Sequence, residues 1–486
     1  MYADIIIKNG RCMTMCGDGG ADWVAAAGKM ICAAGRGDDW QKLVRPGTQV
    51  IDARGGTVLP GFIDNHFHVM QTAVNMMSVD LGGARSHREL GEMLAAAEKR
   101  EGAVLGCQVE ESQFEEKRFP DRYVLDKYCS DSPVVLFSKE YHVSMLNTHA
   151  LLYYKVPFSL EGVELDGSGL PTGIFRRNAN YVLRSNVLRS LPDEFRMEAI
   201  HLAMSRLLEN GITTVAAIEG GWLFDDRDAE FIYAHSGEFP VDMPLFYQTM
   251  DLAKVWKLGL RRVGGNIMVD GTLSSHSAAL SAPYADRPDY RGQIFLPQDG
   301  LDEFVQQCYR QDMQLALYSI GDRAIESVLL AHERAIRQGG STALRHRIEH
   351  AIMATPEQIA RAADMKLIFS VQPAYAYLWG GKGGMYERRM GERYLRSNDF
   401  AAMFAAGAVD GKSAEELLRS DFKEFHIAEQ NLGVGQVTCI NSEHLMERKD
   451  DLLKAMRQMR QEHGYDMVIL MLTDVLMEGT QLLYVG

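Results

Sequence analysis

Hydrophobic and polar positions along the chain follow three different patterns in succession. Over residues 1–58 the apolar runs are short, as in "ADIIIKNGRCMTM", "DWVAAAGKMICAAG" and "TQVIDARGGTVL", and each is bounded by Gly or Asp. Short runs containing Val and Ile between turn-forming residues predict β-strands. The first segment is therefore expected to form a small β-sheet unit.

From residue 59 to about 400, apolar strand-like segments alternate with helical patterns. The strand-like segments are 133–138, 213–221, 266–271, 314–322, 346–351 and 366–373. Between two of them lies "RAIESVLLAHERAI", whose residues Ile325, Val328, Leu329 and Ile336 fall on one helix face. Because alternating strands and helices favour parallel strands, residues 59–400 predict an α/β architecture, most economically a (β/α) barrel of the TIM type.

The pattern changes again near residue 401. Ser413 and Glu416 form a capping-box spacing, and "LGVGQVTCI" reads as a strand. A charged amphipathic helix is expected over residues 443–463, followed by a buried strand in "YDMVILMLTDVL". Residues 401–486 are thus expected to form a separate C-terminal α/β domain.

The composition and net charge limit the kinds of molecule that the protein is expected to bind. Hydrophobic residues make up 46% of the 486 residues and charged residues 24%, as in globular proteins, while the net charge of -14 argues against a binder of nucleic acid or of an anionic membrane. The seven cysteines are scattered without a CxxC pair, and no apolar stretch reaches the ~18 residues of a membrane span. We expect a soluble, cytoplasmic protein that acts on small molecules. The sequence leaves open whether it forms a homo-oligomer.

The segment "VLPGFIDNHFHV" holds two histidines one residue apart. Side chains alternate along a strand, so His66 and His68 project to the same face and can converge on one cation. At the carboxyl end of a first barrel strand they would lie where barrel enzymes carry out their chemistry. The alternative for such a pair is a surface or core role, because histidines on strands are common.

This segment closely resembles the first-strand signature of the amidohydrolase superfamily. The resemblance continues in order through "GLPTGIFRRNANYVL", "GITTVAAIEGG", "VDGTLSSHSAAL", "PYADRPDYRGQIFLP", "SIGDRAIESVLLAHE", "RHRIEHA" and "SVQP", and is greatest for the branch that contains N-substituted formamide deformylases. It implies a β-sandwich on residues 1–58, a barrel over 59–400, and hydrolysis of an amide-like carbon–nitrogen bond by a metal-bound water. The implied metal is divalent, and we expect zinc.

The resemblance also assigns candidate site residues. His66 and His68 match metal ligands, and His350 in "RIEHA" matches a histidine ligand on a later strand, with His346 in a supporting role. Glu219, which ends "TTVAAIE", is a candidate bridging metal ligand and catalytic carboxylate. Its alternative role is a loop acid or a helix cap.

Several expected ligands are replaced. Asn266 lies where some relatives carry a carbamylated lysine, and Tyr318 lies where relatives carry a histidine ligand. A neutral phenol with a pKa near ~10 is a poor ligand for zinc. The aspartate expected at the end of the eighth strand has no matching motif, so the barrel is expected to be incomplete at its last strands. Asp474 is the candidate for this catalytic role.

The tail resembles another family. "GKSAEELLRSDFKEF", "LGVGQVTCIN" and "GYDMVILMLTDVLMEGTQLLYVG" look like the DHH-associated C-terminal domain of family II inorganic pyrophosphatases. This resemblance implies that Lys423 binds phosphate, with a solvated surface lysine as the alternative, and it suggests manganese for the tail. Three functions therefore remain open: a metal-dependent hydrolase of a C–N bond, a non-catalytic remnant that binds a small molecule or metal, and a phosphoanhydride hydrolase.

Overall fold

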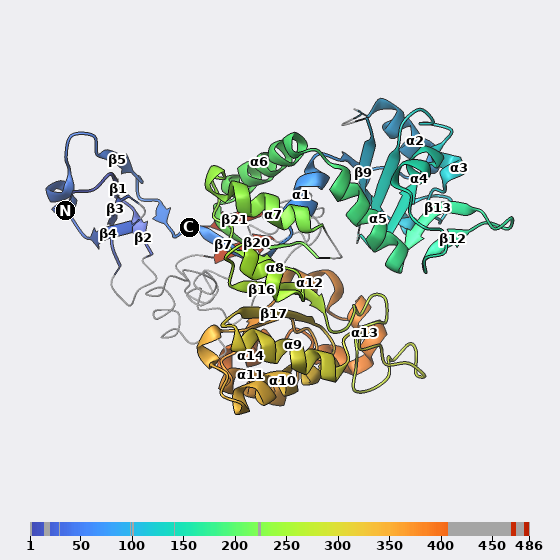
Figure 1. Ribbon diagram of the computed structural model, residues 1–486. Coiled ribbons are helices and arrows are strands. Elements are labelled where there is room, and N and C mark those ends of the chain that lie inside the picture. The colour runs from blue at the N-terminus through green and yellow to red at the C-terminus, as the bar shows by residue number, and fades with distance from the viewer. Residues whose placement is uncertain are drawn as a thin grey trace.

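The computed structural model describes residues 2–406, apart from 14–19, 29, 98, 100–101, 140 and 222–224, together with two strands near the C-terminus. Three sheets dominate it. In the view of Figure 1, a small N-terminal sheet and a sheet of strands β8–β13 lie on either side of a barrel of parallel strands and helices.

The N-terminal sheet has four strands in the order β4-β3-β1-β5. They are β1 Ile5–Lys8, β3 Trp23–Ala27, β4 Met30–Gly35 and β5 Gln49–Asp52, and a separate pair joins β2 Arg11–Cys12 to β6 Thr57–Val58. Ile6, Trp23 and Ala25 are buried on one face of the sheet. The strands predicted for the first segment are thus confirmed.

The barrel sheet has seven strands in the order β19-β18-β17-β16-β15-β14-β7, and every neighbouring pair is parallel. The strands are β7 Phe62–Phe67, β14 Ile212–Glu219, β15 Leu245–Tyr247, β16 Arg262–Met268, β17 Gln314–Ser319, β18 Arg347–His350 and β19 Ile368–Ser370. This nearly closed parallel sheet confirms the predicted TIM-type α/β fold.

Helices that precede or follow the barrel strands pack on the outside. They are α1 Val69–Met76, α6 Asp193–Glu209, α7 Asp226–His235, α8 Leu252–Lys257, α9 Gln298–Arg310, α10 Asp322–Arg337 and α11 Pro356–Asp364. Val215 and Ala217 of β14 belong to the large core between strands and helices, whereas Ala216 and Ile218 belong to a small cluster inside the barrel. By this alternation Ile218 points inward and Glu219 points to the helix layer.

A six-stranded sheet, in the order β12-β13-β11-β10-β9-β8, is inserted between β7 and β14. Its strands are β8 Val79–Asp80, β9 Val104–Val109, β10 Val134–Ser138, β11 Val143–Leu146, β12 Val163–Leu165 and β13 Pro171–Arg176. With it pack α2 His87–Ala96, α3 Arg122–Leu125, α4 Thr148–Tyr154 and α5 Arg177–Ser190. The expectation that residues 133–138 form a barrel strand is wrong, because β10 pairs antiparallel with β11 in this separate sheet.

The barrel is open between β19 and β7, since no described strand joins these two edges. Side chains connect them instead. The Arg347 Nη2 atom donates to the Asn65 carbonyl at 2.6 Å and to Ser370 Oγ at 2.9 Å. Among the described residues, the sheet thus has seven strands and stays unpaired between β19 and β7, in line with the predicted incompleteness at the last strands.

In the tail, β20 Val468–Leu472 pairs antiparallel with β21 Gln481–Val485. The strand predicted in "YDMVILMLTDVL" is thus confirmed in part, whereas Lys423, Asp474 and the capping box at Ser413 lie outside the described residues. Among the helices that are described, none combines the length and the apolar character needed to cross a membrane.

Candidate active site

Three histidines meet at the carboxyl ends of barrel strands. His66 lies in β7, His68 is the N-cap of α1, and His350 ends β18. The His66 ring centroid lies 5.1 Å from that of His68 and 5.0 Å from that of His350. The structure thus brings together the three histidines that the sequence singles out.

Each of these rings is held through its Nδ1 atom by an oxygen from another element. The pairs are His66 with Glu349 Oε2 at 2.7 Å, His68 with the Ile218 carbonyl at 3.2 Å, and His350 with Gln372 Oε1 at 2.5 Å. Because all three partners are acceptors, each imidazole donates from Nδ1 and carries its lone pair on Nε2. Histidines that bind metals are oriented in the same way.

Burial also favours the ligand form of two of them. It lowers the pKa of His68 to about 3, and it lowers the pKa of His350 to about 3 as well. Both rings are therefore neutral at physiological pH, as metal coordination requires.

Glu349 is a site residue that the sequence analysis missed. Its buried carboxylate accepts from Arg347 Nε at 2.7 Å and from Arg347 Nη2 at 2.9 Å, besides the bond from His66. Burial alone would raise the pKa of Glu349, but the Arg347 charge and the His66 bond hold that pKa at about 2. The available signal was "RIEH", which places Arg347 and Glu349 on one face of a strand that ends in a histidine.

Tyr318 is the last but one residue of β17 and lies against His350, with ring centroids 4.5 Å apart. Burial, with the nearby Asp270 carboxyl, raises the pKa of Tyr318 well above its ordinary value. The side chain is thus a neutral phenol at a position where the resemblance predicts a histidine ligand. Asn266 lies in β16, and its carbonyl accepts a hydrogen bond from Gln248 Nε2 at 3.1 Å.

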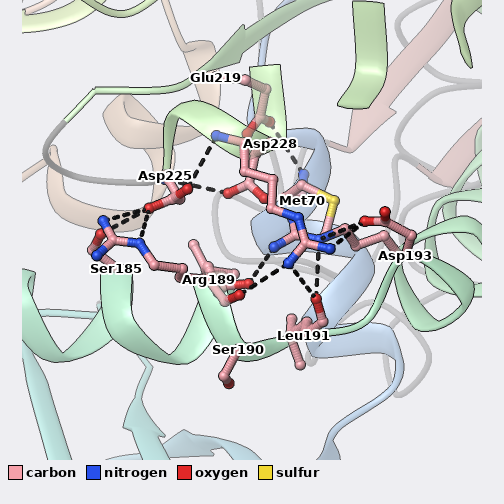
Figure 2. Close-up of polar contacts among 12 residues, drawn as sticks. Met70, Ser185, Arg189, Ser190, Leu191, Asp193, Glu219, Asp225 and Asp228 are labelled. Carbon is pink, nitrogen blue, oxygen red and sulfur yellow. Dashed lines mark hydrogen bonds and ion pairs between the residues drawn. The ribbon is translucent and has the colours of Figure 1, made fainter. Parts of the chain in front are cut away.

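Glu219 is not brought into the histidine cluster. Its side chain points to the helix layer, where Oε1 accepts the backbone N–H of Met70 at 3.1 Å at the start of α1 (Figure 2). Burial raises the pKa of Glu219 to about 8. Of the two roles considered for Glu219, the structure supports the helix cap, and a bridging metal ligand would need the opposite face of β14.

The surroundings of Glu219 are a buried polar network outside the barrel. Arg196 of α6 forms an ion pair with Asp228 of α7, and both side chains are fully buried. The Arg196 Nε atom also donates to the Leu191 carbonyl at 3.3 Å, and neighbouring Asp225 accepts from Arg189 (Figure 2). These contacts join α5, α6 and α7 and give the network a structural role.

His346 supports the strands rather than the histidine cluster. Its Nδ1 atom accepts the backbone N–H of Leu315, the second residue of β17, at 3.0 Å. Its ring packs against Tyr309 and His332, with centroids 4.2 and 5.0 Å away. The supporting role expected for His346 is consistent with these contacts.

Aromatic side chains line one side of the cluster. Tyr375 of α12 (Pro373–Trp379) stacks parallel to His350 with centroids 5.9 Å apart, and Trp379 lies 4.7 Å from Tyr375. Tyr386 of α13 (Met385–Met390) follows at 6.4 Å from Trp379. These rings give the site an apolar wall.

The three histidines are the donor set that a metal ion would meet at this site. Within the described part of the chain, no three His, Cys, Asp or Glu side chains already stand in the arrangement of a metal site. The donor atoms of His66, His68 and His350 are nevertheless of the type that divalent transition metals prefer, because the Nδ1 partners leave the lone pairs on Nε2. Three imidazoles are thus suited to such an ion, and Tyr318 is not a substitute for a fourth.

Comparison with solved structures agrees with the fold. An uncharacterized metal-dependent hydrolase from Pyrococcus horikoshii superposes with a TM-score of 0.70 at 23% identity, over 83% of this chain and 80% of that chain. Residues 401–486 match the DHHA2 domain. They are 41% identical over 85 residues to the cobalt-dependent inorganic pyrophosphatase of Clostridium perfringens, of which the match spans 16%.

The main part of the chain has relatives in sequence as well. It is 26% identical over 420 residues to the N-substituted formamide deformylase of Arthrobacter pascens, covering 80% of this chain and 76% of that protein. The family model described as "Amidohydrolase family" matches residues 49–411. The seven-stranded barrel, the histidine cluster at its mouth and this match together assign the chain to the amidohydrolase family, fused to a DHHA2 domain.

Proposed function

We propose that the protein is a metal-dependent hydrolase that cleaves an amide-like C–N bond of a small molecule. The observation that carries this proposal is the cluster of His66, His68 and His350, whose rings share one tautomer at the carboxyl ends of parallel strands. The relative named N-substituted formamide deformylase supports the choice of bond. A cytoplasmic location, without nucleic acid or membrane as partner, belongs to the same proposal.

The residues of this chain have distinct parts in such a reaction. His66, His68 and His350 would hold the divalent ion, and zinc is the expected metal. When bound, the ion supplies Lewis acidity toward the substrate carbonyl. Tyr375 and Trp379 offer an aromatic surface for the apolar part of the substrate.

Turnover is expected to be slow. Positioned acid–base groups contribute roughly 10²- to 10⁴-fold to such reactions. The sequence offers two carboxylates for proton transfer, Glu219 and Asp474. Because Glu219 caps α1, we propose Asp474 for this step.

The experiment compares metal content and amine release for the full chain, His66→Ala and His235→Ala, with N-formyl and N-acyl amines as substrates. His235 is a matched control, because it lies on α7 in a surface ion pair with Glu238. We expect about one zinc ion in the full chain and in the control, and its loss in His66→Ala. Equal metal content in all three proteins would contradict the proposal, and bound metal without any turnover would favour the non-catalytic alternative.

A second candidate is hydrolysis of a phosphoanhydride by the DHHA2 domain. The pyrophosphatase relative favours it, but the chain spans 16% of that protein. We therefore expect no release of phosphate from pyrophosphate with manganese or cobalt present. Activity that disappears in Lys423→Ala would establish this function instead.

A further inference from the structure

A buried ion pair lies on the inner side of β18, next to His66. The guanidinium of Arg347 approaches the Glu349 carboxylate as a fork, with Nε 2.7 Å from Oε1 and Nη2 2.9 Å from Oε2. The side chains of Arg347 and Glu349 are 1% and 0% exposed. Neither residue has a part in the proposed function so far.

Arg347 reaches beyond its own strand. Its Nη2 atom also donates to the carbonyl of Asn65 in β7 and to Ser370 Oγ in β19, and its guanidinium lies 4.6 Å from the centroid of the Phe246 ring. One side chain thus contacts both edges of the open sheet. A planar guanidinium can satisfy these acceptors together, whereas the compact ammonium of a lysine cannot.

The same pair fixes His66 in two ways. The Glu349 carboxylate accepts the Nδ1 proton of His66, so it selects the tautomer with the lone pair on Nε2. The bond from Arg347 to Asn65 holds the backbone one residue before His66. Ring and backbone are therefore oriented by a single unit.

We infer that Arg347 and Glu349 are positioning residues for His66, which set its tautomer and its orientation toward a ligand at Nε2. The part of this inference that concerns a metal ligand at Nε2 rests on the proposed function. The part that concerns the tautomer of His66 is independent of it. A variant that keeps the approximate size of Glu349 but removes its acceptor oxygens should therefore release the ring even in metal-free protein.

The first test reads the tautomer directly. The full chain is labelled with ¹⁵N-histidine, freed of metal with a chelator, and examined by NMR, with the His66 signals assigned by their loss in His66→Gln. We expect the Nδ1–H form in the unmodified chain and in Arg347→Lys, which keeps the charge beside Glu349. In Glu349→Met, which has no acceptor oxygen for the Nδ1 proton, we expect a shift toward Nε2–H. Glu326→Met is the matched control, because Glu326 pairs with Arg361 away from the site.

The second test is zinc affinity, measured by competition with a coloured chelator. Loss of the partner of a ligating histidine typically costs 10- to 100-fold in metal affinity, and we expect this loss in Glu349→Met but not in Glu326→Met. The inference is overturned if the unmodified chain holds His66 as Nε2–H, or if Glu349→Met keeps both the tautomer and the affinity. A shifted tautomer in a chain that binds no zinc would uphold the positioning role and refute the proposed function.

Discussion

The Tyr318 ring meets the His350 ring edge to face, with centroids 4.5 Å apart and planes at 66°. A buried phenol thus directly contacts His350 at a position where the sequence resemblance predicts a histidine ligand. We expect Tyr318→His to tighten zinc binding by about tenfold or more, since an imidazole is a far better zinc ligand than a neutral phenol. Calorimetric titration of zinc measures this, and Tyr318→Phe should bind as the unmodified chain does. Two tightly held ions in the unmodified chain would contradict this ligand assignment.

The buried pair of Arg196 and Asp228 predicts a large loss of stability when one partner is neutralised. Asp228→Asn removes the nearest carboxylate of the buried Arg196 guanidinium and leaves it with the half-exposed Asp193, 3.8 Å away. Breaking a buried pair costs about 3–5 kcal/mol. Urea denaturation measures the free energy of unfolding. The control is Asp39→Asn, whose partner Lys42 is exposed, and exposed pairs contribute about 0–1 kcal/mol. Equal losses in both variants would show that the buried pair is not important for stability.

His332 predicts a loss of stability in acid. Burial lowers the pKa of His332 to about 3, whereas the unfolded chain titrates near its ordinary value of 6.5. The unfolded state then binds the extra proton, so this stabilisation is complete above pH 6.5 and declines toward pH 3, by up to about 1.4 kcal/mol per pH unit. His332→Phe should make the dependence shallower over this range. An unchanged slope in urea denaturation would argue against a neutral buried His332.

Glu219 predicts the opposite dependence at higher pH. Its pKa is raised by burial to about 8 from an ordinary value of 4.5, so the folded state holds a proton that the unfolded state releases. The contribution to stability is complete below pH 4.5 and is lost as pH rises to about 8. Glu219→Gln, which keeps the shape without the charge, should flatten this decline. Denaturation of both proteins from pH 5 to pH 8 decides the point.

The barrel and the histidines could be predicted from the sequence because both produce patterns within short segments. Strand and helix periods alternate from β14 to β19, and His66 and His68 lie within one strand end. The inserted sheet could not be predicted in this way. An apolar run such as Val134–Ser138 indicates a buried strand, but it does not indicate which sheet the strand joins.

The side of a strand that a residue occupies was harder to predict. Glu219 ends a strand whose pairing with β7 shifts register twice, so the alternation of its side chains cannot be counted reliably from the sequence. Glu349 went unrecognised for another reason. Its importance depends on His66, which is 283 residues away and comes close only when β7 and β18 join the same barrel.

At the open side of the barrel, the carbonyl oxygen of Asn65 is an acceptor for which two kinds of donor can compete. The Asn65 carbonyl accepts the Arg347 donor that also holds Glu349. A strand from any source that filled the space beside β7 would bring its own N–H groups to the same stretch of backbone. We therefore expect that a strand paired with this edge would compete for the Asn65 carbonyl and so change how the backbone beside His66 is held.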